Sequence, residues 1–122
     1  MAISTNADAL GKRGEHATAL YLEGLGYRII ARNWRIKEGE LDLVAIAPEG
    51  EVVFTEVKTR SSNAFGNPLE AISREKLWRI QRLALAWLAT NQRLGARYRI
   101  DVSGVLLGRS GEISIDYRID VS

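Results

Sequence analysis

Three charged side chains stand in a stretch of sequence that is otherwise mostly aliphatic. They are Asp42, Glu56 and Lys58, within LDLVAIAPEGEVVFTEVKTR at residues 41–60. A charge inside a sheet costs free energy unless it is paired or used in chemistry. Two carboxylates with a lysine beside them can hold a divalent cation and activate a water molecule. The stretch is therefore a candidate catalytic site, provided that the fold brings the three side chains together.

The spacing of this stretch predicts a hairpin that sets the two carboxylates opposite each other. The turn at residues 47–50 separates apolar strands at 40–47 and 51–59. With residues 47 and 51 facing each other across the turn, Asp42 stands opposite Glu56. One face would carry Asp42, Val44, Ile46, Val52, Phe54, Glu56 and Lys58, and the other Leu41, Leu43, Ala45, Val53, Thr55 and Val57. Both faces are largely apolar, so we expect the hairpin to be covered on both sides.

Opposed carboxylates in a covered hairpin repel each other by on the order of 3 kcal/mol at an effective dielectric of about 20. A divalent cation between them would offset this repulsion better than Lys58 alone. Mg²⁺ or Mn²⁺ would screen a phosphate, and the lysine would orient or deprotonate water, which suits hydrolysis of a phosphodiester bond. The alternative is an ordinary ion-pair cluster, with Lys58 paired to Glu56 or Asp42. Spacing alone leaves both interpretations open.

Length and composition predict a single globular domain over residues 1–122. Hydrophobic residues make up 46% of the chain and charged residues 26%, which is typical of a folded protein rather than a disordered one. The chain has no cysteine and one histidine, so oxygen atoms are the expected metal ligands. No apolar run approaches the roughly 20 residues of a membrane span, and the N-terminus lacks the apolar region of a signal peptide. We therefore expect a cytoplasmic protein that does not contact a membrane.

The remaining sequence predicts an α/β fold. Helical periodicity and capping residues indicate helices at 7–25 and 72–92, a polar loop spans 60–71, and β-branched or aromatic runs indicate strands at 27–35, 97–108 and 112–118. The order αβββαββ contains a helical crossover, which places the fourth strand parallel to a neighbour. We predict a mixed central sheet with helices on both faces.

Each predicted helix has a face that should turn toward the sheet. In the first helix this stripe is Leu10, Gly14, Ala17, Tyr21 and Leu25, and in the second it is Ile72, Ile80, Leu83 and Trp87. Lys76 falls inside the second stripe, so it either points at the charged hairpin or extends to water. Trp78 and Leu85 fall on the opposite side of that helix. An exposed apolar pair of this kind is typical of a protein interface, and we expect a homodimer through it.

Several short motifs occur in an order that resembles the YraN family. They are G-K-R-G-E (11–15), G-Y (26–27), R-N (32–33), G-E-L-D (39–42), E-V-K-T-R (56–60) and G-N-P-L-E-A (66–71). Asp42 with Glu56-Val57-Lys58 also resembles the D…(D/E)-x-K signature of the PD-(D/E)xK nucleases, with leucine in place of the proline. YraN proteins are predicted nucleases that are similar to archaeal Holliday-junction resolvases. The resemblance implies the restriction-endonuclease-like αβββαβ core and a metal-dependent endonuclease.

The same resemblance implies a role for a glutamate on the first helix. In resolvase-like nucleases such a glutamate joins the metal site, and in this sequence the matching residue is Glu15. The implied metal ligands are then Asp42, Glu56 and Glu15, and the implied catalytic set adds Lys58. Small neighbours of Glu15 on the helix would let that helix approach the sheet closely.

Two acidic residues have alternative interpretations. Glu15 as a surface residue would pair with Lys12, three positions earlier on the helix. Glu40 is expected on the strand face opposite the metal site, where it ends the strand or pairs with Arg35 or Lys37. We therefore leave Glu40 out of the predicted metal site.

Basic residues around the predicted site would bind the phosphates of nucleic acid. The candidates are Lys12, Arg13, Arg35, Arg60 and Lys76. The leading hypothesis is a nuclease that uses Mg²⁺ or Mn²⁺ to cut DNA, including branched or damaged DNA. The alternatives are a non-catalytic nucleic-acid-binding module with the same fold, and a structural protein in which the three charges form an ion-pair network.

Overall fold

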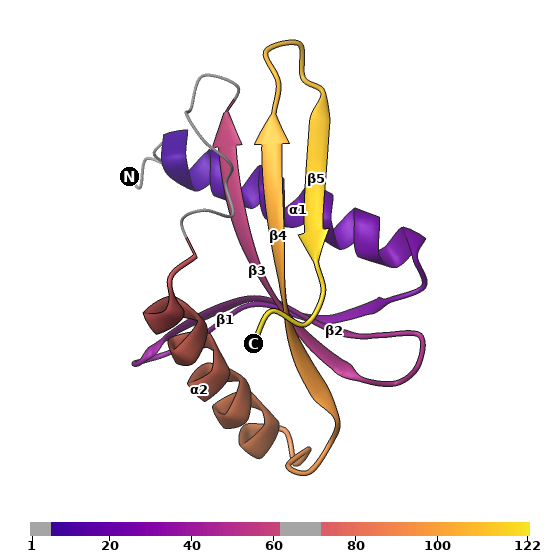
Figure 1. Cartoon of the computed structure of the whole chain (residues 1–122), viewed down its shortest axis with the longest axis vertical. Helices are drawn as coiled ribbons and strands as arrows, with labels where there is room; N and C mark the ends of the chain where they lie inside the picture. Colours follow the sequence, from indigo (N-terminus) through magenta and orange to yellow (C-terminus); the bar gives the residue numbers. More distant parts are fainter. Residues whose placement is uncertain (1–5, 62–71) are drawn as a thin grey trace, which may run out of the picture.

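Two helices and five strands make up the described part of the chain (Figure 1). The structure is a computed structural model that describes residues 6–61 and 72–122. In chain order the elements are α1 (Asn6–Gly24), β1 (Arg28–Ile36), β2 (Gly39–Ile46), β3 (Val52–Ser61), α2 (Arg74–Thr90), β4 (Tyr98–Leu107) and β5 (Ile113–Arg118). The predicted order is confirmed, with each boundary within about two residues. Most of the predicted loop at 60–71, including the motif at 66–71, lies outside the described residues.

All five strands belong to one sheet, in which neighbours in the sequence are also neighbours in space. The order is β1-β2-β3-β4-β5; β3 and β4 are parallel, and the other neighbouring pairs are antiparallel. The parallel pair requires a crossover connection, and α2 provides it. In Figure 1, α1 crosses β3, β4 and β5, whereas α2 lies beside β1 and β2. The mixed sheet with helices on both faces is therefore confirmed.

The larger apolar core lies between α2 and one face of the sheet. Its buried members are Leu41, Val44, Val52, Phe54, Ile80, Leu83, Ala84, Trp87, Leu88 and Ile100. Phe54 and Trp87 meet edge to face, with their ring centroids 5.7 Å apart. Ser73 caps α2 by accepting a hydrogen bond from the backbone N–H of Lys76 at 3.1 Å. This cap starts α2 so that Lys76 lies in its first turn, beside β3.

On the opposite face, α1 approaches the sheet through small residues. A Cβ atom added to Gly14 would overlap the Thr59 side chain of β3, so only glycine fits at this contact. One turn later, the buried Thr18 and Ser103 hydroxyls share a hydrogen bond of 2.8 Å. The predicted stripe was therefore wrong in part, because Tyr21 is exposed and the buried line runs through Gly14 and Thr18. This close contact sets the position of the residue that follows Gly14 in the helix.

The β2–β3 hairpin has the predicted turn but not the predicted faces throughout. Ala47 donates a backbone hydrogen bond to Glu51 at 2.9 Å, and the ladder pairs Leu43 with Thr55, as the predicted register requires. Leu41, however, packs in the α2 core with Val44, whereas strict alternation would put it with Leu43 on the α1 side. Alternation therefore breaks between residues 41 and 44, where β2 leaves the ladder with β3.

A buried polar network joins β3, β4 and β5 on the α1 side. Asp101 is fully buried and accepts hydrogen bonds from Tyr117 at 2.6 Å and from Arg99 at 3.1 Å. Tyr117 also shares a 2.8 Å hydrogen bond with Thr55. Burial and the neighbouring carboxylate raise the pKa of Tyr117, so its hydroxyl keeps the proton that it donates to Asp101. The network compensates for the burial of this charge and aligns the strands next to β3.

We predict that Gly14→Ala destabilises the protein although alanine is the better helix former. The added methyl group overlaps Thr59 and must push α1 away from β3, and overpacking of this kind costs about 1–3 kcal/mol. Gly11→Ala is the matched control, since a Cβ there meets nothing within 4 Å. That variant should gain about 0.5–1 kcal/mol from helix propensity. Urea denaturation measures the free energy of unfolding of both variants. If Gly14→Ala stabilised the protein as much as Gly11→Ala does, the close contact between α1 and β3 would be contradicted.

Candidate metal centre

Asp42 lies at the point where β2 and β3 separate. The ladder between the two strands ends at the pair Leu43–Thr55, one position before Asp42 would face Glu56. Instead of a further backbone pair, the N–H of Val57 donates to the Asp42 carboxylate at 2.8 Å. The Asp42 side chain therefore bridges the two strands. Its other carboxylate oxygen can still accept a hydrogen bond or bind a cation where the strands separate.

Three carboxylates gather at this opening. One ligand oxygen from each of Glu15, Glu40 and Asp42 lies within 4.8 Å of the other two, and each residue is partly exposed. Glu15 comes from α1, in the turn set by the Gly14 contact, whereas the other two come from β2. Oxygen ligands at these separations could hold a metal ion. The structure thus places the predicted Glu15 and Asp42 together.

An asparagine on β1 holds two of these carboxylates in place. The Asn33 side-chain amide donates to Glu15 Oε1 at 3.0 Å and to Glu40 Oε1 at 2.8 Å. Its backbone has φ of 51°, in the left-handed region where asparagine is tolerated better than most residues. The pairing of β1 with β2 also shifts register between Ile29 and Ala31. Asn33 occurs in the R-N motif, but nothing in the pattern assigned it a role.

Glu40 lies with Glu15 and Asp42, so the prediction that it would lie on the opposite strand face was wrong. It precedes Asp42 by two positions, so strand alternation puts the two on the same side, and this signal was available in the sequence. The expected ion pair with Arg35 is confirmed, at 2.6 Å. Arg35 holds the pKa of Glu40 below its ordinary value by a hydrogen bond, with burial opposing it and Asn33 assisting. Glu40 therefore carries a negative charge beside Asp42.

The crowding of carboxylates changes the protonation of Asp42. Burial raises the pKa of Asp42 to about 8, and the negative charge of Glu56 adds to the rise, while the N–H of Val57 opposes it. Glu15 contributes in the same direction as Glu56. At neutral pH the centre therefore holds a proton, because another charge in this space is unfavourable. A bound cation would reverse that preference.

Glu56 is turned toward α2. Its carboxylate forms an ion pair with Lys76 at 3.1 Å, and the side chains are only 11% and 28% exposed, respectively. Of the two positions considered for Lys76, the structure selects the one that points at the site. Glu56 interacts with Asp42 but does not belong to the group of three oxygens formed by Glu15, Glu40 and Asp42. Its role as a metal ligand stays a prediction.

The two lysines of the site influence each other. The pKa of Lys58 is lowered by the Lys76 side chain, and partial burial and the charge of Lys76 lower it further. Burial alone would lower the pKa of Lys76 as well, but its contacts with Lys58 and Glu56 outweigh this and raise it. Lys76 is therefore the ammonium that pairs with Glu56, and Lys58 is the lysine that loses its proton more readily.

A cavity of about 380 Å³ opens above the carboxylates on the α1 side. Its lining residues are Asp8, Gly11, Lys12, Glu15, Asn33, Arg35 and Glu40. Two of the predicted nucleic-acid contacts, Lys12 and Arg35, thus border the acidic centre. Arg13 is exposed on α1 and Arg60 is partly exposed near the end of β3. The contact of these residues with nucleic acid stays a prediction.

Comparison with known proteins identifies relatives over most of the chain. The model of the uncharacterised protein family UPF0102 matches residues 14–105. A UPF0102 protein of Beutenbergia cavernae is 49% identical over 111 residues, which cover 90% of this chain and 92% of that protein. Another, of Mycolicibacterium smegmatis, is 49% identical over 107 residues, covering 87% and 86%. A third, of Clavibacter michiganensis, is 44% identical over 112 residues, covering 92% and 94%.

Among solved structures, SfsA of Pyrococcus furiosus in complex with Ca²⁺ matches with a TM-score of 0.38 and 20% identity. The match covers 95% of this chain but only 63% of SfsA. Within residues 6–61 and 72–122, neither helix has the length and apolar character needed to cross a membrane.

We predict that the stability of the metal-free protein falls as pH rises from about 4 to about 8. Asp42 has a folded-state pKa of about 8 against an ordinary value of 3.8, so folding takes up a proton in this window. Raising the pH across it therefore favours the unfolded state. Asp42→Asn mimics the protonated acid and should be more stable than wild type near pH 9, by at least about 1 kcal/mol. The two proteins should converge below about pH 4.

Urea denaturation in the presence of a chelator measures this difference across the pH range. Glu49→Gln, in the exposed turn between β2 and β3, is the matched control and should leave the pH profile unchanged. An Asp42→Asn profile parallel to that of wild type would mean that Asp42 is ionised in the folded protein.

Proposed function

The chain belongs to the UPF0102 family, the YraN family that its motifs predicted, and we propose that it is a metal-dependent nuclease that hydrolyses phosphodiester bonds in DNA. One observation carries the proposal: the carboxylates of Glu15, Glu40 and Asp42 converge where β2 separates from β3. Lys76 acts on Asp42 and pairs with Glu56, and Lys58 interacts with Lys76 and Glu56. Acidic ligands with adjacent amines are suited to a cation and a phosphate bound together.

The donor set favours a hard divalent cation, and we propose Mg²⁺ or Mn²⁺. Glu15, Glu40 and Asp42 offer carboxylate oxygens, which such ions prefer. A bound cation of this kind lowers the pKa of a water ligand and offsets the charge of a phosphate. Asp42 would give up its proton to hold the ion, and Glu56 stands next to it, held by Lys76.

Lys58 is the residue that we propose to act on the attacking water. Its lowered pKa brings the neutral amine closer to the pH of the cell, and a neutral amine can accept a proton. Lys76 keeps its charge, pairs with Glu56 and maintains the environment that lowers the pKa of Lys58. In this proposal Lys58 transfers the proton, and Lys76 balances the charge of Glu56.

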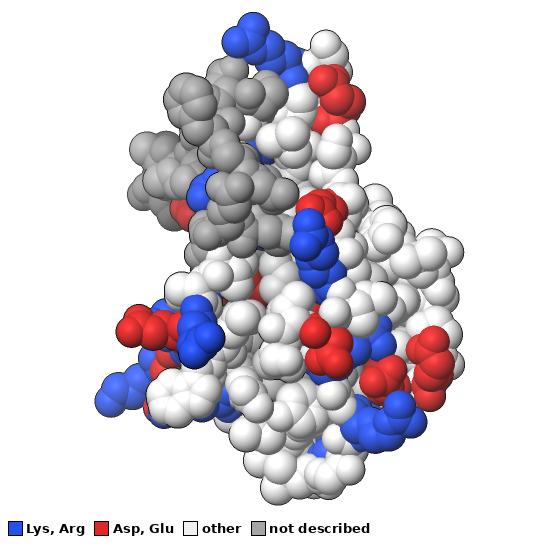
Figure 2. Space-filling model, in the orientation of Figure 1, with Lys and Arg blue, Asp and Glu red and all other residues white. Residues whose placement is uncertain are grey.

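The proposed substrate is DNA, with branched or damaged DNA as the specific class that the family resemblance implies. Lys12 and Arg35 border the acidic cavity and would position the phosphates on either side of the cut. On the face shown in Figure 2, blue and red side chains are mixed and no broad positive area is formed. We propose that binding depends on the cations that border the acidic cavity.

Two other functions would use the same fold. A non-catalytic nucleic-acid-binding module would gain nothing from carboxylates placed where phosphates bind, since the charges repel. A structural protein would use the cluster as an ion-pair network, yet Glu15 and Asp42 have no ion pair among the residues that the structure describes. Both alternatives fit the centre less well than a metal-dependent nuclease does.

We predict that Mn²⁺ binds wild type and supports cleavage of a labelled four-way DNA junction, and that Asp42→Asn loses both. Glu40→Gln should weaken Mn²⁺ binding, because it removes one of the three converging oxygens. Lys58→Met should bind Mn²⁺ normally but cleave about 10²–10⁴-fold more slowly, because only proton transfer is lost. Isothermal titration of Mn²⁺ and single-turnover cleavage measure the two steps separately.

Glu49→Gln is the matched control for the loss of one carboxylate, and it should behave as wild type in both measurements. Wild type that binds no Mn²⁺, or cleavage that survives in Asp42→Asn, would refute the proposal. In the first case the charges would be a structural cluster.

We also propose a homodimer through the exposed side of α2. Trp78 and Leu85 are 64% and 44% exposed, as their position outside the buried stripe predicted. Trp78→Glu should abolish dimerisation in sedimentation at high protein concentration, because it places a charge in an apolar contact. Leu94→Glu is the control, since Leu94 is equally exposed (68%) but lies beyond the end of α2. Wild type that sediments only as a monomer would rule out the dimer.

A further inference from the structure

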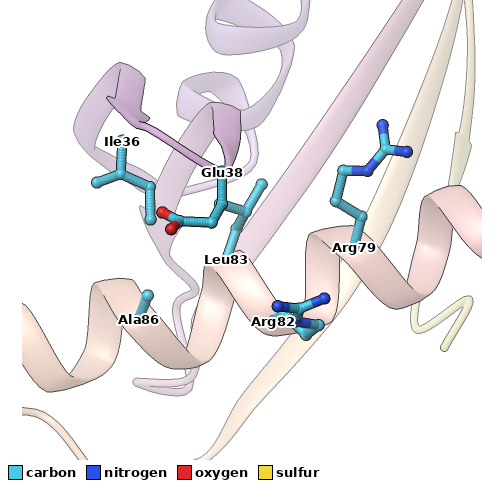
Figure 3. A pocket seen from close by; sticks show the side chains of 6 residues that line it. All are labelled: Ile36, Glu38, Arg79, Arg82, Leu83 and Ala86. Atoms are coloured by element: carbon cyan, nitrogen blue, oxygen red, sulfur yellow. The ribbon is translucent and has the colours of Figure 1, made fainter.

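A groove of about 510 Å³ lies on the α2 side of the β1–β2 turn (Figure 3). Ile36 and Glu38 line it from the turn side, and Arg79, Arg82, Leu83 and Ala86 line it from α2. Arg79 and Arg82 fall outside the buried stripe of the helix, and both are exposed. Their side chains line the groove from α2.

The two arginines have no acidic partner in the described part of the chain. Neither Arg79 nor Arg82 forms an ion pair there, although Glu38 lines the same groove. Figure 3 shows the Glu38 carboxylate pointing toward Ile36 and Ala86, away from the Arg79 guanidinium. The positive and negative groups therefore lie in different parts of the groove.

Arg82 is also held in position by an aromatic ring. Its guanidinium lies over the Trp78 ring, 5.6 Å from the ring centroid. A cation–π contact restricts the guanidinium without neutralising it, so the charge stays available to an anion. Exposure of Trp78 thus has a second explanation beside the proposed dimer contact.

The backbone of the β1–β2 turn connects the groove to the acidic centre. A Cβ atom on Gly39 would lie 3.1 Å from Leu83 and 3.9 Å from the Arg79 stem. Gly39 directly precedes Glu40 and lies three residues before Asp42, or about 10 Å along an extended strand.

We propose that this groove binds the phosphodiester backbone of the nucleic acid whose scissile bond lies at the carboxylates, so that Arg79 and Arg82 form a second phosphate-binding subsite. The proposal rests on the proposed nuclease function. The occupant follows from charge complementarity: guanidinium groups that have no acidic partner among the described residues recognise phosphate, and the walls formed by Ile36, Leu83 and Ala86 accommodate the apolar faces of sugars. The strand would pass over the β1–β2 turn, from Lys12 and Arg35 on one side to the groove on the other.

The subsite is tested with the double variant Arg79→Gln/Arg82→Gln. Fluorescence anisotropy measures its affinity for a DNA duplex at several salt concentrations. Loss of two phosphate contacts should reduce the slope of log K against log salt by about 1.8. Arg79→Lys/Arg82→Lys keeps the charges and should keep the slope. The matched control is Arg28→Gln/Arg93→Gln, which removes two exposed arginines elsewhere and should change the slope little.

Cleavage provides a second readout that separates the groove from the chemistry. Bis(p-nitrophenyl) phosphate is too small to reach from the carboxylates to the groove, so the double variant should hydrolyse it as wild type does. On the long duplex the variant should show a raised KM and an unchanged kcat, since the groove acts in binding. A sedimentation profile identical to that of wild type excludes an effect through oligomerisation.

The outcomes distinguish this subsite from the proposed function. If the double variant and its matched control have the same salt slope, the subsite is refuted while metal-dependent cleavage stands. If the slope falls but no variant cleaves DNA, the subsite is supported and the nuclease proposal fails. If wild type binds no DNA at all, both fail.

Discussion

Electrostatic crowding at the separation of β2 and β3 is the constraint on which the rest of the structure depends. Asp42 has Glu15 and Glu40 within 4.8 Å, and Glu56 acts on it from β3. Each pair of charges at such a distance costs on the order of 3 kcal/mol at an effective dielectric of about 20. The proton retained by Asp42 is the response of the metal-free protein to this repulsion. Repulsion among these carboxylates lowers the stability of the folded protein. A bound ligand that neutralises them would restore it.

Each surrounding element supplies one residue whose type the cluster requires. Gly14 lets α1 rest on Thr59, and only this close approach brings Glu15 to the strands. Asn33 adopts a left-handed backbone conformation in β1 and binds two carboxylates with one amide. Lys76 reaches Glu56 from the first turn of α2. These contacts do not reduce the number of negative charges; they fix where the charges lie, which is what preorganisation of a metal site demands.

The sequence predicted those parts of this arrangement that follow from regular geometry. The turn at residues 47–50 specified the register of β2 and β3, and helical periodicity specified the direction of Lys76. The prediction was wrong where the strands are irregular. Leu41 changes face because β2 leaves its ladder with β3. Asn33 follows a register shift between β1 and β2 that no periodicity in the sequence reveals. The predicted stripe of α1 included Tyr21 and Leu25, whereas these two are exposed and the buried line runs through Gly14, Thr18 and Leu22. Glu40 is a different case, because its two-residue spacing from Asp42 is regular strand geometry and places both side chains on one side.

The β1–β2 turn lies between the converging carboxylates and the two arginines of the groove, and this separation has a consequence for the order of binding. On the α1 side the carboxylates repel a polyanion until a cation neutralises them, so cation and nucleic acid should each strengthen binding of the other. On the α2 side the Arg79 and Arg82 guanidinium groups carry no such penalty. If the proposed subsite binds nucleic acid, the groove would hold it whether or not the carboxylates hold a cation. Glu15, Glu40 and Asp42 would hold the cation, which would offset the charge of a phosphate placed beside them. The groove would then supply affinity that does not depend on the metal, and the carboxylates would contribute binding energy only at the proposed site of cleavage.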